Sequence, residues 1–416
     1  MEFNESQKIA IEHGDGPMLL LAGPGSGKTT VLIHRIKYMI QHHGIRPEHI
    51  LVITFTKAAA NEMKIRFRNL CPEVGSVTFG TFHSVFFWIL RNAYNYTGTD
   101  IITDAEKYGA VRDSIERHGF RYDSQEDFAR NVLGEIGCVK SEMCDLKSYE
   151  STTMKTDDFR VVYDDYENFL RYRGKIDFDD MLVFTYELLS QRQDILDMWR
   201  NRFQYILIDE FQDINTIQYD TVKLLAKERN NIFAVGDDDQ SIYGFRGAAP
   251  AIMKRFPKDF PGTKIEYLNM NYRCSYDVVE CSKRIIKNNT DRYDKNLQSA
   301  FAPGESDRVH IVKVKDGTEQ NRKIVDKIRE LNSAGIPYSD IAVIFRTNTE
   351  PRALSSKLME NGIPFSMKDS IPNIFTHFLA ENIFDYIKLA RGCRERRVLL
   401  RVINKPNRYI SRDALD

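Results

Sequence analysis

Short apolar runs alternate with amphipathic stretches along much of the 416-residue chain. Each apolar run ends at polar or turn residues, which is typical of strands buried within a sheet. The predicted strands are residues 18–22, 50–55, 205–208 and 232–235. The spacing of apolar residues predicts helices at 29–41, 57–69 and 218–227. Strands that alternate with helices predict an α/β fold with a parallel sheet covered on both faces.

Two parts of the chain depart from this rhythm. Residues 86–180 show several amphipathic helical patterns and no strong strand pattern, so we expect a helical insertion there. A second alternation begins near residues 309–314 and continues through 341–345. These two apolar runs are predicted strands of a second α/β region.

A glycine-rich loop, AGPGSGKT at 22–29, joins the first predicted strand to the first predicted helix. Its glycines let backbone N–H groups turn toward a phosphate, and the following helix adds its positive end. Lys28 is expected to reach the β- and γ-phosphates, and the Thr29 hydroxyl to bind Mg²⁺. The alternative, a structural turn, is disfavoured by the order of strand, loop, Lys-Thr and helix. The residues predicted to hold the nucleotide here are Gly23, Pro24, Gly25, Ser26, Gly27, Lys28, Thr29 and Thr30.

An acidic pair, Asp209-Glu210, ends the predicted strand at 205–208. Asp209 can hold Mg²⁺ beside the glycine-rich loop, and Glu210 can accept a proton from an attacking water. This pairing suits hydrolysis better than transfer to a bulky acceptor. The alternative is a solvated strand end, which the presence of the phosphate loop disfavours.

An ordered set of motifs covering almost the whole chain resembles the superfamily 1 DNA helicases of the UvrD/PcrA/Rep type. The motifs are Phe3-Asn4 with Gln7, the loop at 22–29, and the segments 54–59, 80–84, 176–180, 209–213, 236–248 and 271–273. The resemblance implies RecA-like domains, with ATP and Mg²⁺ as cofactors. It also implies an ATP hydrolase that moves 3′ to 5′ along single-stranded DNA, acts at single/double-strand junctions and serves in DNA repair.

The resemblance assigns roles to individual residues. Gln7 would pair with the adenine edge, and Arg35 and Tyr272 would sandwich the base. Arg273 would contact the γ-phosphate and Gln240 would sense it. Taken alone, these would be a surface glutamine, solvated arginines and a core aromatic. The implied catalytic set is Lys28, Glu210, Gln240 and Arg273.

Single-stranded DNA binding needs aromatic rings for base stacking beside cations for the phosphates. The candidate rings are Phe55, Tyr243 and Phe245, and the candidate phosphate contacts are Lys57, His83 and Arg246. Burial in the core is the alternative for Phe55, Phe245 and His83. The family often has Trp where Phe245 stands, and the smaller ring predicts weaker strand affinity.

The resemblance also divides the chain into domains. We expect a first core domain (1–85 and 181–276), a helical insertion (86–180), part of a second core domain (277–372) and the start of an inserted helical domain (373–416). The last two helicase motifs have no counterpart, including the one that supplies a second arginine to the γ-phosphate. Such an arginine is worth about 10³–10⁵ in rate. We therefore expect the N-terminal portion of a longer helicase that binds Mg-ATP, hydrolyses it slowly and unwinds little.

Charge and composition narrow the class of protein. Lys plus Arg and Asp plus Glu are both 59, so the chain as a whole is not basic. Basic stretches at 51–70 (net +3) and 391–408 (net +6) leave room for a local basic groove, whereas 141–180 carries net −5. The hydrophobic fraction of 42% and the charged fraction of 28% are typical of a soluble globular protein.

Targeting and cysteine patterns predict a cytoplasmic protein, and we also expect a monomer. The sequence has no apolar run of membrane-spanning length and no secretory signal pattern. The six cysteines are scattered without CxxC spacing, which fits reduced thiols better than a zinc site or a disulfide scaffold. Two other functions stay open. One is a non-motor P-loop ATPase or kinase, and the other is a nucleotide-gated DNA-binding module without turnover.

Overall fold

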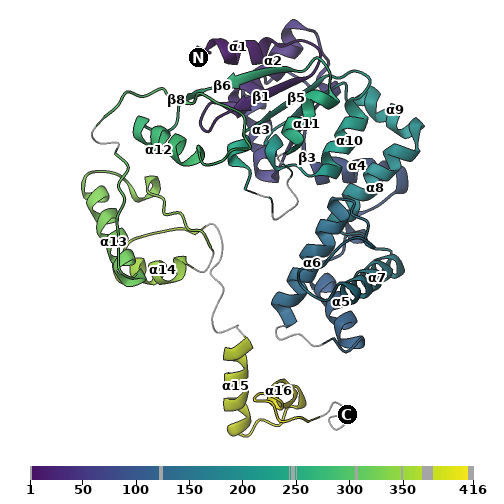
Figure 1. The fold of residues 1–416 in the computed structure, drawn as a ribbon, viewed down its shortest axis with the longest axis vertical. Helices are drawn as coiled ribbons and strands as arrows, with labels where there is room; N and C mark the ends of the chain where they lie inside the picture. Colours follow the sequence, from purple (N-terminus) through teal and green to yellow (C-terminus); the bar gives the residue numbers. More distant parts are fainter. Residues whose placement is uncertain are drawn as a thin grey trace. The chain divides into compact units, whose positions relative to one another are not determined.

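Figure 1 shows the computed structural model of the chain, which describes residues 2–120, 125–242, 244, 249, 251–304, 308–347, 350–367 and 378–410. The chain separates into two compact units, Met1–Val309 and His310–Asp416. Each unit has an apolar core of its own.

The first unit is built on a six-stranded sheet with the order β3-β2-β4-β5-β1-β6, and every neighbouring pair is parallel. Its four inner strands match the four predicted apolar runs to within one residue. They are β1 (Met18–Ala22), β2 (Ile50–Thr54), β4 (Tyr205–Ile208) and β5 (Ile232–Gly236). These strands are almost wholly buried, as expected for a parallel sheet covered on both faces. The predicted α/β fold is confirmed.

The two edge strands were not predicted from the apolar pattern. They are β3 (Thr78–Thr81) and β6 (Lys264–Leu268). Both mix polar with apolar residues and both are partly exposed, because only one neighbouring strand covers each of them.

Helices cover both faces of this sheet. Leu19 and Leu21 of β1 belong to one buried cluster, and Leu20 belongs to the other, because successive side chains of a strand point to opposite faces. The helices on the Leu20 face are α1 (Glu5–Glu12), α2 (Lys28–His42) and α3 (Lys57–Leu70). Those on the other face are α4 (Phe82–Tyr94), α8 (Phe178–Gln191), α9 (Gln193–Arg202), α10 (Thr216–Ala226) and α11 (Ala251–Asp259).

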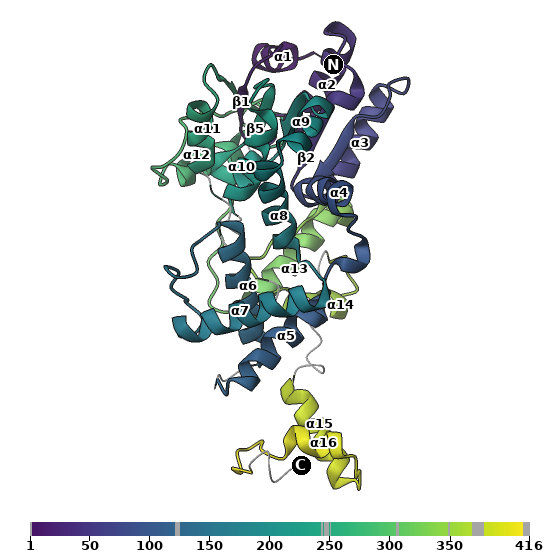
Figure 2. The same ribbon diagram turned by 90° about the vertical axis from the view of Figure 1, so that its right-hand side faces the viewer.

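Three further helices between β3 and β4 form a group with its own core. They are α5 (Asp104–Arg117), α6 (Gln125–Ser141) and α7 (Thr156–Arg173). Val111, Val132 and Phe159 lie at the centre of that core and are fully buried. Figures 1 and 2 both show this group beyond one end of the sheet, joined to it through α4 and α8. The sequence predicted helices in this region, and helices are found.

A short strand pair extends the first unit past the last strand of the main sheet. It consists of β7 (Met270–Asn271) and β8 (Gln298–Ser299), paired in parallel across α12 (Tyr276–Ile286). Residues 277–309 therefore pack with the first unit, whereas the sequence assigned residues from 277 onward to a second core domain. The full division into four domains stays a prediction.

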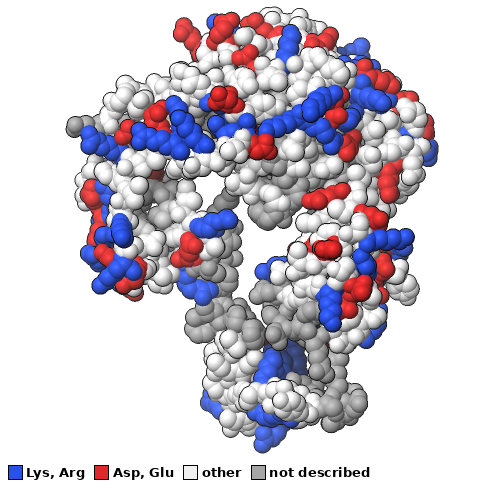
Figure 3. All heavy atoms as spheres, in the orientation of Figure 1, with Lys and Arg blue, Asp and Glu red and all other residues white. Residues whose placement is uncertain are grey.

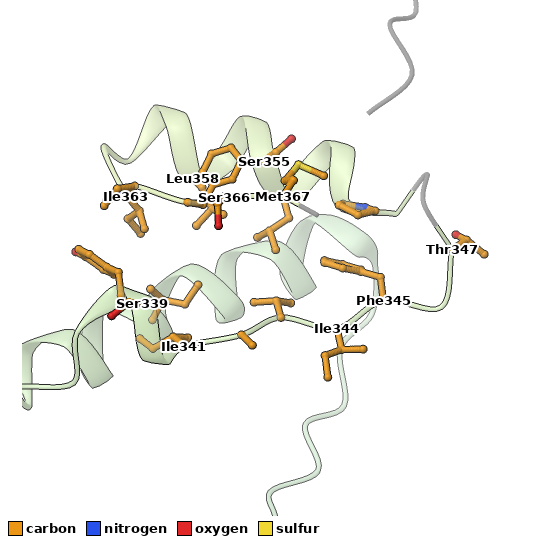
Figure 4. A pocket seen from close by; sticks show the side chains of 18 residues that line it. Ser339, Ile341, Ile344, Phe345, Thr347, Ser355, Leu358, Ile363, Ser366 and Met367 are labelled. Carbon is orange, nitrogen blue, oxygen red and sulfur yellow. The ribbon is translucent and has the colours of Figure 1, made fainter. Parts of the chain in front are cut away.

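The second unit contains α13 (Gly317–Ser333), α14 (Pro351–Glu360), α15 (Phe378–Ala390) and α16 (Arg396–Val402). Among its described residues no strand forms, so the strands predicted at 309–314 and 341–345 are wrong there. Ile311 is 94% exposed and Ile344 is 92% exposed. A strand needs a neighbour for its backbone hydrogen bonds, and these extended segments have none among the described residues. Figure 4 shows segment 341–345 and α14 on two sides of a hollow of about 650 Å³.

The remaining features are local. The 3₁₀ turns are η1 (Pro47–His49), η2 (Gly98–Asp100), η3 (Phe211–Asp213), η4 (Asp238–Gln240) and η7 (Tyr338–Asp340). All six cysteines lie in described segments and are free thiols. Within the described ranges, no helix combines the length and the apolar character needed to cross a bilayer. On the face in Figure 3, acidic and basic side chains mingle over the first unit, and basic ones gather on the segment with α15 and α16.

Candidate functional site

Most predicted site residues follow the carboxyl ends of β1, β2, β3, β4 and β5, which lie together at one edge of the parallel sheet. Gln7 and Arg35 lie on α1 and α2 instead, and Tyr272 and Arg273 follow β7. The strand order places β2 and β3 on one side of β4, and β5 and β1 on the other. We call the loops after β1, β4 and β5 the phosphate half of this edge. We call the loops after β2 and β3, together with the first turn of α8, the ring half.

Two glycines allow the phosphate loop to take its shape. Gly25 and Gly27 have φ angles of +66° and +86°, which side chains rarely adopt. A Cβ on Gly25 would lie 2.7 Å from both Asn271 Oδ1 and Arg273 Cβ. Gly27 is the N-cap of α2, so Lys28 and the residues after it present the helix N-terminus to the loop. Pro24, Thr29 and Thr30 are half-buried around this cradle, Gly23 lies at its start, and Ser26 is buried beneath it.

Glu210 faces the lysine of the phosphate loop. Lys28 Nζ donates to Glu210 Oε2 at 3.1 Å. The backbone of Glu210 has φ +52°, a left-handed conformation that is rare outside glycine and clusters at functional sites. This conformation turns the chain sharply after β4 and aims the carboxylate toward the phosphate loop.

Asp209 is positioned for a different task. Its side chain is buried, and among the described residues its Oδ1 atom has no hydrogen-bond partner. Burial raises the pKa of Asp209 to about 7, and the Glu210 charge adds to this shift. A buried carboxylate oxygen without a partner, at the same sheet edge as the Thr29 hydroxyl, fits the oxygen ligands that Mg²⁺ prefers.

A buried glutamine joins the loop after β4 to the loop after β5. Gln212 Nε2 donates to Glu210 Oε2 at 2.9 Å, and Gln212 Oε1 accepts from Asp237 N at 2.9 Å. Asp237 Oδ2 in turn accepts from Gln240 Nε2 at 2.5 Å. A Cβ on Gly236 would lie 2.7 Å from Gln212 Oε1, so only glycine admits this approach. The sequence placed Gln212 within a motif and gave it no role.

The loop after β7 is bound to the phosphate loop. Tyr272 N donates to Gly25 O at 2.9 Å. Asn271 Oδ1 accepts from the backbone N–H groups of Arg273 and Cys274, each at 2.8 Å. This tight turn leaves the Tyr272 ring and the Arg273 side chain exposed beside the phosphate loop, where their predicted roles place them.

The N-terminal motif braces the same loop. The side chain of Gln7 accepts from Asn4 N at 3.1 Å and donates to Ser26 O at 3.1 Å. Asn4 Nδ2 donates to the Tyr272 hydroxyl at 2.9 Å. Gln7 thus holds the start of α1 against the phosphate loop, and its reading of adenine stays a prediction.

The role predicted for Arg35 is wrong. Its side chain is buried, with 2% of the residue exposed, and its guanidinium lies 4.6 Å from the centroid of the Phe233 ring. It donates to the carbonyl oxygens of Ala10, His13 and Gly14 at the end of α1. A guanidinium enclosed in this way joins α2 to α1 and cannot stack on a base.

The ring half carries one exposed aromatic that sequence reasoning missed. Phe178 begins α8 and is 49% exposed. Its ring meets the edge of His83 at 5.7 Å, and Lys107 Nζ lies 5.7 Å from its centroid. Burial and the nearby Lys107 lower the pKa of His83, which favours the neutral imidazole. The available signal was its place in the motif at 176–180, to which the sequence gave no individual roles; the flanking Asp177 is buried, so the aspartates did not reveal that the ring is exposed.

The other ring-half residues sit where the strands end. Phe55 is half-buried between β2 and α3, and Lys57 is the exposed first residue of α3. Tyr243, Phe245 and Arg246 were also predicted to bind DNA; they follow β5 in the sequence rather than a ring-half strand, and they lie outside the described residues.

A buried ion cluster fixes the start of α8. Lys140 Nζ lies 3.0 Å from Asp177 and 2.7 Å from Asp180, and Glu167 completes the cluster at 2.5 Å. Although burial opposes it, these carboxylates raise the pKa of Lys140. Asp177 also caps α8 by accepting from Asp180 N. The helix turn that carries Phe178 is therefore held rigidly by α6 and α7.

A phosphate loop and an acidic strand end on one edge of a parallel sheet define a P-loop nucleotide-binding protein. Residues 3–261 match the family described as UvrD/REP helicase N-terminal domain, and residues 267–416 match the UvrD-like helicase C-terminal domain. The chain belongs to the UvrD/REP helicase family, and the resemblance found in the sequence is confirmed.

Curated relatives agree with this membership. The chain is 33% identical over 423 residues to the ATP-dependent DNA helicase PcrA of Staphylococcus epidermidis, which covers 99% of this chain and 57% of that relative. It is 36% identical to YjcD of Bacillus subtilis (strain 168) over 399 residues. This match covers 92% of this chain and 51% of that relative. The chain thus spans little more than half the length of these relatives.

Proposed function

We propose that the chain is the ATP-hydrolysing, strand-gripping part of a DNA helicase that moves 3′ to 5′ along single-stranded DNA. One observation carries the proposal most directly: the phosphate half and the ring half share one sheet edge, and β4, which leads to Glu210, pairs directly with β2 of the ring half. A change at the nucleotide then reaches the DNA-binding loops through neighbouring strands of one rigid sheet. The domain match and the relatives named as DNA helicases support the same proposal.

The residues of the phosphate half divide the work of hydrolysis. Backbone N–H groups of the phosphate loop and the Lys28 ammonium bind the phosphates. Thr29 and Asp209 hold Mg²⁺, which neutralises negative charge on the phosphate oxygens when bound. Glu210 accepts a proton from the attacking water, and its turn after β4 places it toward the phosphate loop.

Three further residues complete the nucleotide site. Arg273 stands exposed beside Gly25 and contacts the γ-phosphate, and Gln240 senses whether that phosphate is present. Tyr272 stacks on one face of the adenine. Since Arg35 is enclosed, it does not cover the second face of the base.

The ring half grips the strand. Phe55 and Phe178 stack on bases, each worth roughly 1–3 kcal/mol, and stacking accepts every base. Lys57 and Lys107 contact the phosphates. His83 orients the Phe178 ring by its edge contact. We propose that the chain works as a monomer at junctions of single- and double-stranded DNA, in DNA repair.

The experiment is ATP turnover with and without a single-stranded oligonucleotide. We expect slow turnover that the oligonucleotide accelerates, and Glu210→Gln should abolish turnover while retaining ATP binding. Binding of both ligands without turnover in the unmodified chain would favour a nucleotide-gated DNA-binding module. Turnover that DNA leaves unchanged would favour a non-motor ATPase. A chain that binds no ATP contradicts all three functions.

A strand-displacement assay tests the direction of movement. Substrates with a 3′ or a 5′ single-stranded tail are compared under the same conditions. We expect the chain to displace only the strand of the 3′-tailed substrate, and slowly. Preference for the 5′ tail would contradict the proposed direction without touching the ATP site.

A further inference from the structure

Residues 292–299 contact the loops after β1 and β5, two of the three loops of the phosphate half. None of the predicted motifs contains these residues. We call them the return segment, because they bring the chain back from α12 to β8, which pairs with β7. Their contacts reach the loop after β5, the phosphate loop and the strand that leads to Arg273.

The first contact is with three consecutive aspartates after β5. Lys295 Nζ lies 2.5 Å from Asp238 Oδ1 and 2.9 Å from Asp239 Oδ2, and it also bridges Asp237. The Lys295 side chain is only 4% exposed. Arg292 donates to both oxygens of Asp239, at 2.7 and 2.6 Å. The three carboxylates are close enough to share a cation, and the Lys295 ammonium already lies among them.

The other contacts tie the return segment to the phosphate loop and to β7. A Cβ on Gly23 would lie 2.5 Å from Leu297 Cδ1, so the leucine packs directly on the start of the loop. Gln298 and Ser299 pair with Met270 and Asn271, immediately before Tyr272 and Arg273. The segment therefore contacts the phosphate loop and the loop after β5, and it pairs with the strand that leads to Arg273.

Asp237 joins the return segment to the residues proposed to act in hydrolysis. One oxygen accepts from Lys295 and the other from Gln240 at 2.5 Å. The backbone N–H of Asp237 donates to Gln212, which also donates to Glu210. A continuous hydrogen-bonded relay thus runs from Glu210 through Gln212 and Asp237 to Lys295. Among the described residues of this relay, the buried ammonium of Lys295 is the only cationic group outside the phosphate loop.

We propose that Lys295 is a positioning residue that fixes Asp237, and through it the relay of Gln240, Gln212 and Glu210, and that the return segment responds to the nucleotide state. The proposal rests on the proposed ATPase function. A group that acts on the relay should change the rate of the chemical step and leave nucleotide binding nearly intact.

The test compares kcat and KM for ATP in Lys295→Met, Lys295→Arg and the unmodified chain, with single-stranded DNA present. Losing a charged hydrogen-bond partner predicts a fall in kcat of about ten- to hundredfold, with KM unchanged. Lys295→Arg keeps the charge and should recover most of the rate. Lys254→Met is the matched control, because it breaks the exposed ion pair with Asp291, the residue just before the return segment.

A second variant covers the case in which Lys295→Met fails to fold, since that change leaves buried carboxylates without a counter-charge. Arg292→Gln removes only the outer cation, and thermal melting checks its fold. Hydrogen exchange is then compared with and without a non-hydrolysable ATP analogue and Mg²⁺. We expect the analogue to protect residues 292–299 in the unmodified chain, and Arg292→Gln to reduce this protection while the analogue still binds.

Three outcomes overturn the inference while leaving the ATPase function intact. One is a folded Lys295→Met chain with unchanged kcat. Another is Lys254→Met lowering kcat as much as Lys295→Met does. The third is analogue binding without any change in exchange at 292–299. An unmodified chain that fails to bind the analogue overturns the proposed function instead, and the inference falls with it.

Discussion

The two halves of the sheet edge are built on different principles. In the phosphate half, polar groups are paired with one another: Lys28 with Glu210, Glu210 with Gln212, and Asp237 with Gln240. In the ring half, Phe178 is exposed, and it is the helix beneath it that is anchored by buried charges. A triphosphate always presents the same charged groups in the same order, so the site proposed for it can be fixed atom by atom. A strand of DNA offers a different base at each step, so its site needs a fixed platform with an adaptable face.

The largest expected effect comes from removing the cation of the phosphate half. Lys28→Met should lower ATP turnover by about 10²–10³-fold, because one preorganised group that stabilises phosphate charge is lost. Affinity for single-stranded DNA without nucleotide should stay unchanged, since Lys28 lies outside the ring half. Phosphate release and fluorescence anisotropy of a labelled oligonucleotide measure the two effects. A large fall in DNA affinity would break the separation between the halves.

The converse substitution tests the ring half. Phe178→Ala should weaken single-stranded DNA binding by the stacking of one base, about 1–3 kcal/mol, with KM for ATP in the absence of DNA unchanged. Tyr172→Ala is a suitable control, because Tyr172 is 90% exposed on α7 and belongs to neither half. Equal losses for the two variants would show that Phe178 has no special place on the DNA path.

Arg35 joins α2, the helix that follows the phosphate loop, to the end of α1. Arg35→Met should lower the free energy of unfolding by about 1–3 kcal/mol, because buried carbonyl groups at the end of α1 lose their donors. Chemical denaturation measures this change, and Arg66→Met, which breaks only an exposed pair with Glu62, should have little effect. ATP affinity of the folded variant should match that of the unmodified chain. A stable Arg35→Met chain with weak ATP binding would restore the base-stacking role.

The smallest effect expected is on the pH dependence of folding stability, through His13, whose carbonyl oxygen accepts from Arg35. Burial, and then the charge of Arg35, lower the pKa of His13 to about 4 from its ordinary 6.5. As pH falls below 6.5 the unfolded chain binds a proton that the folded chain refuses, so stability is lost down to about pH 4. His13→Gln should remove this part of the loss.

Melting temperatures at pH 7.5 and pH 5 measure the His13 effect. The melting temperature of His13→Gln minus that of the unmodified chain should be more positive at pH 5. A difference that is the same at both pH values would show that His13 does not titrate in this window.

The sequence predicted the inner strands well, because β1, β2 and β5 are apolar on both faces and no other buried element fits such short runs. It failed for β3 and β6, whose polar residues reflect their place at the edge. It also failed at 341–345, where the apolar run is strand-like and Ile344 is nevertheless exposed. Pairing partners decide whether such a run becomes a strand, and one segment of sequence does not reveal them.

In the candidate site, too, the sequence predicted the placement of some residues and misplaced or missed others. Lys28, Asp209 and Glu210 were predicted correctly to share one sheet edge, because motifs at strand ends must meet there. Arg35 was misplaced because its role came from the family resemblance alone, which does not show which side of α2 the residue occupies. Gln212 and Lys295 were missed because their importance comes from contacts across 25 and 58 residues of chain. Their roles in function remain predictions.

The ion pair between Lys28 and Glu210 makes the arrival of ATP an exchange of partners. The lysine is already neutralised by an internal anion, so an incoming phosphate competes with a carboxylate for it. In the proposed ATPase, a phosphate that binds Lys28 breaks this ion pair and leaves Glu210 held by Gln212, so nucleotide binding and the release of the carboxylate from its counter-charge are one event.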